Sequence, residues 1–149
     1  MRQSNIQHVE NEVRGLFVAK AFRLQGRRLQ FEFAHPDAQA LTSAPRPRDS
    51  YTLIVQSTTW QIRQHGRSLA TDTAWPRLID QTLARCIDAQ VRRVSFNPVE
   101  TRIQFDKALV FELGAGDSDL GDPSQLVSWI LLRNHTPILS LGVRHRAAS

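Results

Sequence analysis

An acidic segment near residue 120 holds the densest group of potential oxygen ligands in the sequence. It reads Asp117-Ser118-Asp119-Leu120-Gly121-Asp122, and alternating carboxylates of this kind bind calcium in loops of twelve residues. Here a glycine stands where the third ligand is needed, and Ser128 takes the twelfth position instead of a bidentate glutamate. The pattern favours a solvated loop in which Asp117, Asp119 and Asp122 offer carboxylates to a basic partner.

The single cysteine and the five histidines are the remaining candidates for metal or nucleophilic chemistry. No pair of them has the spacing of a zinc site, and Cys86 lies at an apolar position of a predicted helix, which is typical of a small core residue. A cysteine and a histidine need only meet in space, so a Cys–His nucleophile stays open. The sequence lacks a serine elbow, a phosphate loop and a dinucleotide fingerprint. We therefore predict no catalysis, no cofactor and no metal.

Arginines give the chain its net charge of +5 and could bind nucleic acid or an acidic protein. They gather at Arg23, Arg27 and Arg28, at Arg92 and Arg93, and, in a proline-rich loop, at Arg46 and Arg48. A surface that reads nucleic acid also needs exposed aromatics. The aromatics near the first cluster belong to an alternating strand pattern that predicts burial, so scattered, solvated charge is the simpler interpretation.

The secondary-structure elements that position these residues are predicted from a sequence pattern that occurs twice along the chain. At an offset of 74 residues, Arg-Leu-Gln-Phe-Glu (28–32) matches Arg-Ile-Gln-Phe-Asp (102–106), and Phe22 falls on Phe96. At an offset of 69, Trp60 falls on Trp129. A change of offset indicates connecting loops of different length. Residues that recur in both copies are best explained as scaffold, and Trp75 has no counterpart, which makes it a candidate anchor for a partner.

Each copy is predicted to be a helix followed by antiparallel strands. Ile6, Val9, Val13 and Leu16 form one helical stripe, and a second helix follows Thr73, a plausible N-cap. Period-two alternation predicts strands around 29–33 and 102–106. We expect an α+β fold in which two degenerate helix-plus-meander repeats (4–70 and 73–142) pack as one pseudo-twofold domain covering 1–149.

Two long segments interrupt this regularity, at 34–50 and 114–125. The first is basic and rich in proline, and the second is acidic. Structureless loops of this length are uncommon in compact domains and are often functional. They are therefore candidates for partner contact, through Arg46, Arg48 and the three aspartates, with Trp75 beside them.

The predicted location in the cell rests on sequence features that we do not find. No apolar run approaches the roughly 18–20 residues of a membrane helix, the N-terminus does not read as a signal peptide, and one cysteine cannot form an intrachain disulfide. We predict a cytoplasmic protein with no membrane partner. An edge strand of either sheet offers a place where a second copy could pair as a homodimer.

The second copy resembles a class of small bacterial proteins with a duplicated strand-turn-strand pattern and a tryptophan that opens a later strand. The resemblance rests on Thr101–Leu113, Ser128–Leu132 and Ile138–Leu141 and on their echo in the first half. Lys107 stands where that pattern expects the glycine of an Asp-Gly turn. Some members resemble immunity proteins, which bind and neutralise a toxin of the same organism. The predicted core, the missing chemical signature and the two long, unlike loops favour a non-enzymatic protein-binding module, and the resemblance implies that it could be immunity-like; the alternative is a nucleic-acid-binding accessory protein with an arginine-rich face.

Overall fold

The computed structural model describes residues 2–25, 28–35, 50–56, 59–96, 100–114 and 127–142. Its elements run in the order helix, five strands, helix, five strands. They are α1 (Arg2–Val13), β1 (Phe17–Arg23), β2 (Leu29–Ala34), β3 (Tyr51–Val55), β4 (Trp60–Gln64), β5 (Arg67–Thr71), α2 (Pro76–Cys86), β6 (Val91–Ser95), β7 (Thr101–Phe105), β8 (Leu109–Leu113), β9 (Val127–Arg133) and β10 (Thr136–Gly142). The predicted α+β class with antiparallel sheets is confirmed.

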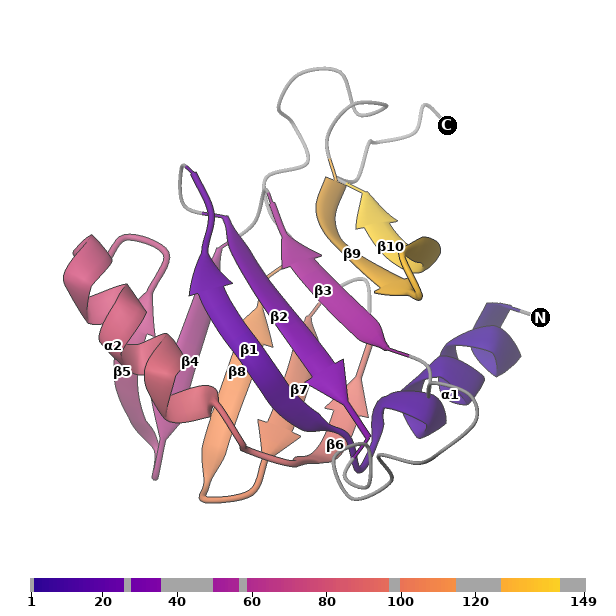
Figure 1. Cartoon of the computed structure of the whole chain (residues 1–149), viewed down its shortest axis with the longest axis horizontal. Helices are drawn as coiled ribbons and strands as arrows, with labels where there is room; N and C mark the ends of the chain where they lie inside the picture. Colours follow the sequence, from indigo (N-terminus) through magenta and orange to yellow (C-terminus); the bar gives the residue numbers. More distant parts are fainter. Residues whose placement is uncertain are drawn as a thin grey trace, which may run out of the picture.

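Each of the two sheets draws strands from both halves of the chain (Figure 1). Sheet A has the order β1-β2-β3-β9-β10, and sheet B has the order β5-β4-β8-β7-β6. The first three strands of each half therefore pair with the last two strands of the other half. A meander confined to each half, as the sequence suggested, is wrong, because the chain crosses from sheet A to sheet B between Val55 and Trp60.

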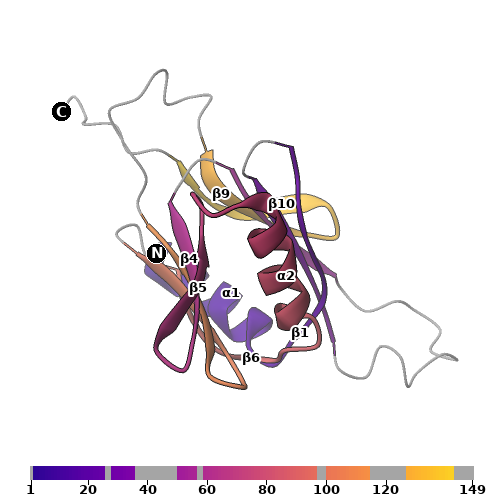
Figure 2. The same ribbon diagram turned by 90° about the vertical axis from the view of Figure 1, so that its left-hand side faces the viewer.

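Both helices lie between the sheets (Figure 2). The helix α2 packs against β1 of sheet A and β5 of sheet B, and α1 packs against β6. Apolar side chains three or four residues apart explain this placement, since they form one buried stripe. On α2 the stripe consists of Ile79, Thr82, Leu83 and Cys86. The helix begins after Trp75 instead of Thr73, whose hydroxyl pairs with that of Thr71.

A short antiparallel contact joins the two sheets where β1 and β6 begin. Phe17 bridges to Gln90, and the Val18 amide donates to the Ala89 carbonyl at 2.9 Å. The Val91 amide donates to the Leu16 carbonyl at 2.8 Å. Because these bonds tie the edge strand of one sheet to the edge strand of the other, the sheets are fixed at one corner.

One apolar cluster fills the space between the sheets and includes residues of both helices and both sheets. Strands β2, β3, β7 and β8 each bury every second residue, as alternation predicts. Phe31 packs against Phe111 of the other sheet, with ring centroids 4.9 Å apart. Phe96 is buried as expected, but Phe22, its match in the repeat, is 37% exposed. Phe22 is therefore not part of the scaffold core.

Tight turns close the last hairpin of each half. His65 and Gly66 join β4 to β5 with φ of 52° and 79°, and Asn134 and His135 join β9 to β10 with φ of 53° and 70°. Two consecutive residues with positive φ form the turn whose twist matches that of antiparallel strands. In the described residues, neither helix has the length and apolar character needed to cross a bilayer.

Candidate interaction surfaces

Of the residues predicted to contact a protein partner, Trp75 lies within the described ranges; Arg46, Arg48, Asp117, Asp119 and Asp122 lie outside them. Its side chain is 79% exposed, and that of Leu78, one turn along α2, is 41% exposed. The Trp75 backbone is fixed, because its carbonyl accepts the first helical hydrogen bond from Ile79 at 3.0 Å. An indole in this setting presents a large apolar area from a rigid support.

The helix behind Trp75 is held by both apolar and charged contacts. Ile79 and Leu83 are buried in the core, and Asp80 receives two hydrogen bonds from Arg23 on β1, at 3.0 and 3.1 Å. The bond to Asp80 raises the pKa of the Arg23 guanidinium. Arg23, which the sequence offered for nucleic-acid binding, therefore already has an anionic partner.

The described arginines of that prediction lie in two places. Arg28 is close to Arg23 in the first hairpin, since the Leu24 amide donates to the Arg28 carbonyl at 2.7 Å, and the Arg28 guanidinium donates to the Gln25 carbonyl at 3.1 Å. Arg92 and Arg93 are exposed on β6, an edge strand of sheet B, whereas Arg23 lies on sheet A. Arg27 is outside the described residues. The first and second arginine groups therefore lie on different sheets.

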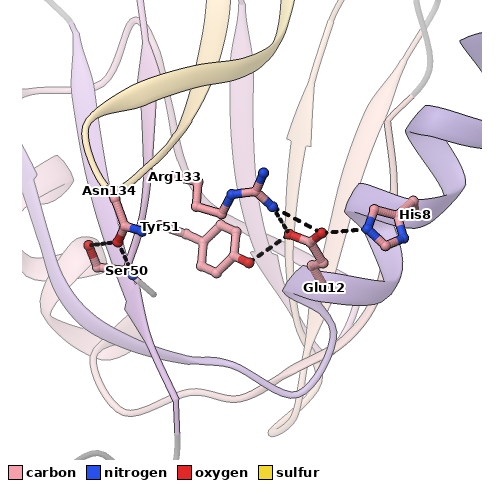
Figure 3. Close-up of polar contacts among 6 residues, drawn as sticks. All are labelled: His8, Glu12, Ser50, Tyr51, Arg133 and Asn134. Carbon is pink, nitrogen blue, oxygen red and sulfur yellow. Dashed lines mark hydrogen bonds and ion pairs between the residues drawn. The ribbon is translucent and has the colours of Figure 1, made fainter. Parts of the chain in front are cut away.

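A polar cluster that joins α1 to two strands centres on Glu12, a residue that the sequence did not single out (Figure 3). Its carboxylate accepts hydrogen bonds from the Tyr51 hydroxyl at 2.6 Å and from Arg133 at 2.8 and 3.1 Å. The His8 Nε2 lies 2.8 Å away. These four residues come from α1, β3 and β9, so the cluster ties the first helix to sheet A.

The properties of this cluster are those of a structural contact between α1 and sheet A. Burial and the bond to Glu12 raise the pKa of Tyr51 to about 12, which keeps the phenol neutral near pH 7. The same carboxylate raises the pKa of Arg133. A phenol whose pKa is raised is not an activated nucleophile or base, since catalytic groups are tuned toward the working pH.

Sheet B has a hydrogen bond at the corresponding place. Arg85, near the end of α2, donates to the Gln64 side chain at 3.0 Å, and Gln64 ends β4 as Arg133 ends β9. A last-turn helical residue thus contacts the end of a fourth strand in both cases. This recurrence favours a structural role for Glu12.

Cys86 has no features of a reactive thiol. It is fully buried, and burial raises its pKa to about 12. Its sulfur lies 3.6 Å from the Thr82 carbonyl, one turn back along α2. The thiolate, which is the nucleophilic form, is therefore scarce near neutral pH. Among the described residues, no three His, Cys, Asp or Glu side chains gather as a metal site would require.

Trp60 and Trp129 are buried, as expected for scaffold residues, with exposed fractions of 3% and 2%. Each pairs with the last residue of a third strand, Trp60 with Leu113 and Trp129 with Val55. Both indole Nε1 groups are buried without a hydrogen-bond partner in the described part of the chain.

The outward faces of the two sheets differ in chemistry. The two central strands of sheet B carry Gln61, Arg63, Glu112 and one apolar residue, Val110, on that face. Glu112 lies 3.1 Å from Arg102 and 3.7 Å from Arg63, so the face is covered by an ion-pair network. This is the ordinary pattern of a sheet that faces water.

Sheet A is apolar at the corresponding places. Its central strands carry Ile54, Ile130 and Leu132 and one polar residue, Thr52, on the outward face. All four are half-buried. The sequence signal was the apolar run Trp129–Leu132 in β9; β3 has a run of three, Leu53–Val55, and β8 of sheet B has one of the same length, Leu109–Phe111. Such runs are typical of strands covered on both faces.

Comparison with protein-family models, with curated proteins and with solved structures finds no match to this chain.

Proposed function

We propose that this chain is a non-enzymatic module that binds another protein. The observation that carries the proposal is Trp75, exposed over 79% of its surface at the start of a helix that the core holds in place. Tryptophan is enriched among the residues that dominate binding energy, and a rigid backbone lowers the entropy lost on binding. Leu78 enlarges the apolar area, and exposed Arg77 lies beside it.

The partner that fits this surface has an apolar pocket with acidic residues at its rim. Charge near the rim mainly accelerates association and selects partners, and the chain's net charge of +5 favours an acidic one. Some members of the class that the second half resembles are similar to immunity proteins, whose partner is a toxin. We extend the proposal to that pairing.

Affinity capture from an extract of the source organism tests this function. The wild-type chain should retain one protein in stoichiometric amount, and Trp75→Ala should retain at least tenfold less, since a loss of 1.4 kcal/mol changes affinity tenfold. Ile87→Ala is the matched control, because it removes an exposed apolar residue at the other end of α2. Equal retention by Trp75→Ala and wild type would contradict the proposal.

The tryptophans provide an independent measurement. Trp60 and Trp129 are buried and Trp75 is exposed, so acrylamide should quench mainly Trp75. Addition of the captured protein should reduce this quenching. A nucleic-acid partner, the alternative function, would instead give binding to an oligonucleotide that weakens steeply with salt.

A pseudo-twofold duplication, with repeats 4–70 and 73–142 in one domain, is also proposed. The strand pairings support this duplication, but they align the two halves differently from the sequence. Leu29 pairs with Val55, which pairs with Trp129; Thr101 pairs with Leu113, which pairs with Trp60. The counterpart of Leu29 is then Thr101 instead of Ile103, a shift of two residues. A shift of two keeps every side chain on its own face of the sheet, which is why the sequence alignment looked consistent.

A further inference from the structure

We propose that the outward face of sheet A binds a second copy of this chain. The face is defined by Phe22 on β1, by Ile54 on β3 and by Ile130 and Leu132 on β9, with Lys20, Gln30, Glu32 and Thr52 between or beside them. Ile54 and Ile130 are direct cross-strand partners, and Leu132 pairs with Thr52 in the next row. Ile54, Ile130 and Leu132 therefore form a continuous apolar centre, and Phe22 lies beyond Gln30, which stands between it and Ile54.

The outward face of sheet B shows which residues occupy these positions on a sheet that contacts only water. Both sheets have five strands, both pack their inner face on the same core, and both helices lie between them. In the register that places Trp60 opposite Leu113 and Trp129 opposite Val55, Glu112 corresponds to Ile54, Gln61 to Ile130 and Arg63 to Leu132. Three charged or polar residues on sheet B are thus replaced by three large aliphatic ones on sheet A.

No described element covers these residues. The helices occupy the inner side of sheet A (Figure 2), and the contacts of the described elements hold no helix or strand against its outer side. The three aliphatic side chains are half-buried by their neighbours in the sheet, and apolar surface that is contiguous and left uncovered marks interaction sites in soluble proteins. Sheets also pack readily face to face, at a separation of about 10 Å with strands within about 30° of each other.

Symmetry favours a second copy as the occupant. A twofold axis that runs between β3 and β9, parallel to the strands, brings Ile54 of each copy onto Ile130 of the other. This reciprocal contact is the isologous arrangement found in most homodimers. The Ile54–Ile130 pair of one copy can therefore pack on the same pair of the other copy.

Charge points to the same occupant. Lys20 and Glu32 are cross-strand partners on this face, and Glu32 accepts a hydrogen bond from Gln30 at 3.0 Å. The face is electrically balanced, although the whole chain carries +5. A copy with the same net charge meets little repulsion here, whereas nothing on the face selects an acidic partner. Trp75 with its neighbouring Arg77 lies on α2, which leaves the proposed heterologous contact on a different surface.

The size of the face sets the strength of the expected dimer. Five strands spaced about 4.8 Å apart, with about 3.4 Å per residue, give a footprint of roughly 300–400 Å². Standard interfaces bury about 800 Å² on each partner. We therefore expect a reversible dimer that forms progressively between about 1 µM and 1 mM, the range of weak interfaces.

Analytical ultracentrifugation of the full chain over that range tests the proposal. The weight-average mass of the wild type should rise toward that of a dimer with concentration. Ile54→Glu and Ile130→Gln, which copy the residues of sheet B, should stay monomeric, and Ile54→Thr should shift the midpoint at least tenfold higher. Gln61→Ala, on the outward face of sheet B, and Trp75→Ala should behave as the wild type.

Circular dichroism melting identifies variants that fold, and only these are compared. A wild type that is monomeric at every concentration overturns the proposal. So does a folded Ile54→Glu or Ile54→Thr variant that associates like the wild type. Self-association that is lost in Trp75→Ala and kept in Ile54→Glu would move the homodimer to α2 and also overturn it.

Discussion

At the scale of single residues, Tyr51 shows how the structure assigns chemistry that sequence could not. Its ring is buried at the start of β3. The hydroxyl reaches Glu12, 39 residues earlier in the chain, and shares that carboxylate with Arg133, 121 residues from Glu12. No local pattern links positions so far apart, which is why sequence analysis missed this cluster.

Tyr51 is the chain's one tyrosine, so its ionisation can be measured without ambiguity. Absorbance at 295 nm should show the native phenol titrating near pH 12 and the urea-unfolded phenol near 10. Since the folded pKa is the higher one, the stabilisation is fully present below about pH 10 and is lost as pH rises toward 12.

The variant Tyr51→Phe gives the corresponding stability measurement. Its free energy of unfolding should lack the part of the alkaline decrease that comes from this phenol. A native tyrosine that titrates near pH 10, like the unfolded chain, would contradict the hydrogen bond to Glu12.

At the scale of elements, sequence predicted the alternating strands around 29–33 and 102–106 and did not predict β1 and β6. The pairings of β1 and β6 contain bulges, at Val18/Lys20 and at Val91/Arg93. A bulge inserts an extra residue and breaks the period of two. In β6 the buried residues Val91 and Val94 are consequently three apart, which is a helical spacing. A strand whose own residues do not alternate can be recognised only once its partner is known.

The helix α2 lets apolar and charged contributions be compared directly. Ile79→Ala empties a fully buried site and should destabilise the protein by about 2–4 kcal/mol. Asp80→Ala removes the Arg23 pair, whose side chains are 32% and 51% exposed, and should cost less than about 1 kcal/mol. Urea denaturation of both variants measures the two values. A larger cost for Asp80→Ala would show that the ion pair, and not the core, holds the helix under Trp75.

At the scale of the whole molecule, the mixed composition of the sheets explains why topology was out of reach of sequence. Strands that follow each other in the chain pair as hairpins, but β3–β9 and β4–β8 pair across at least 74 and at least 45 residues respectively, and no residue pattern encodes such partners. The apolar runs in β3 and β9 were visible, yet their significance depends on the two strands being neighbours. The fold class could therefore be predicted, and the candidate surface on sheet A could not.

One shared core predicts that the sheets unfold together. Each sheet holds one buried tryptophan, Trp129 in sheet A and Trp60 in sheet B. In a Trp75→Phe background, Trp60→Phe and Trp129→Phe variants report on one sheet each. Within each variant, fluorescence and far-ultraviolet circular dichroism should give coincident urea transitions. A separate transition for either sheet would contradict a common core.

The crossing between β3 and β4 also has a consequence during synthesis of the chain on the ribosome. When Val55 has emerged, β3 can pair with β2, but its other partner β9 begins only at Val127. At about 5–20 residues per second, that strand arrives roughly 4–15 s later. Until then the nascent protein carries an open, apolar strand edge: sheet B can be completed once Leu113 has emerged, but sheet A only after β10 ends at Gly142.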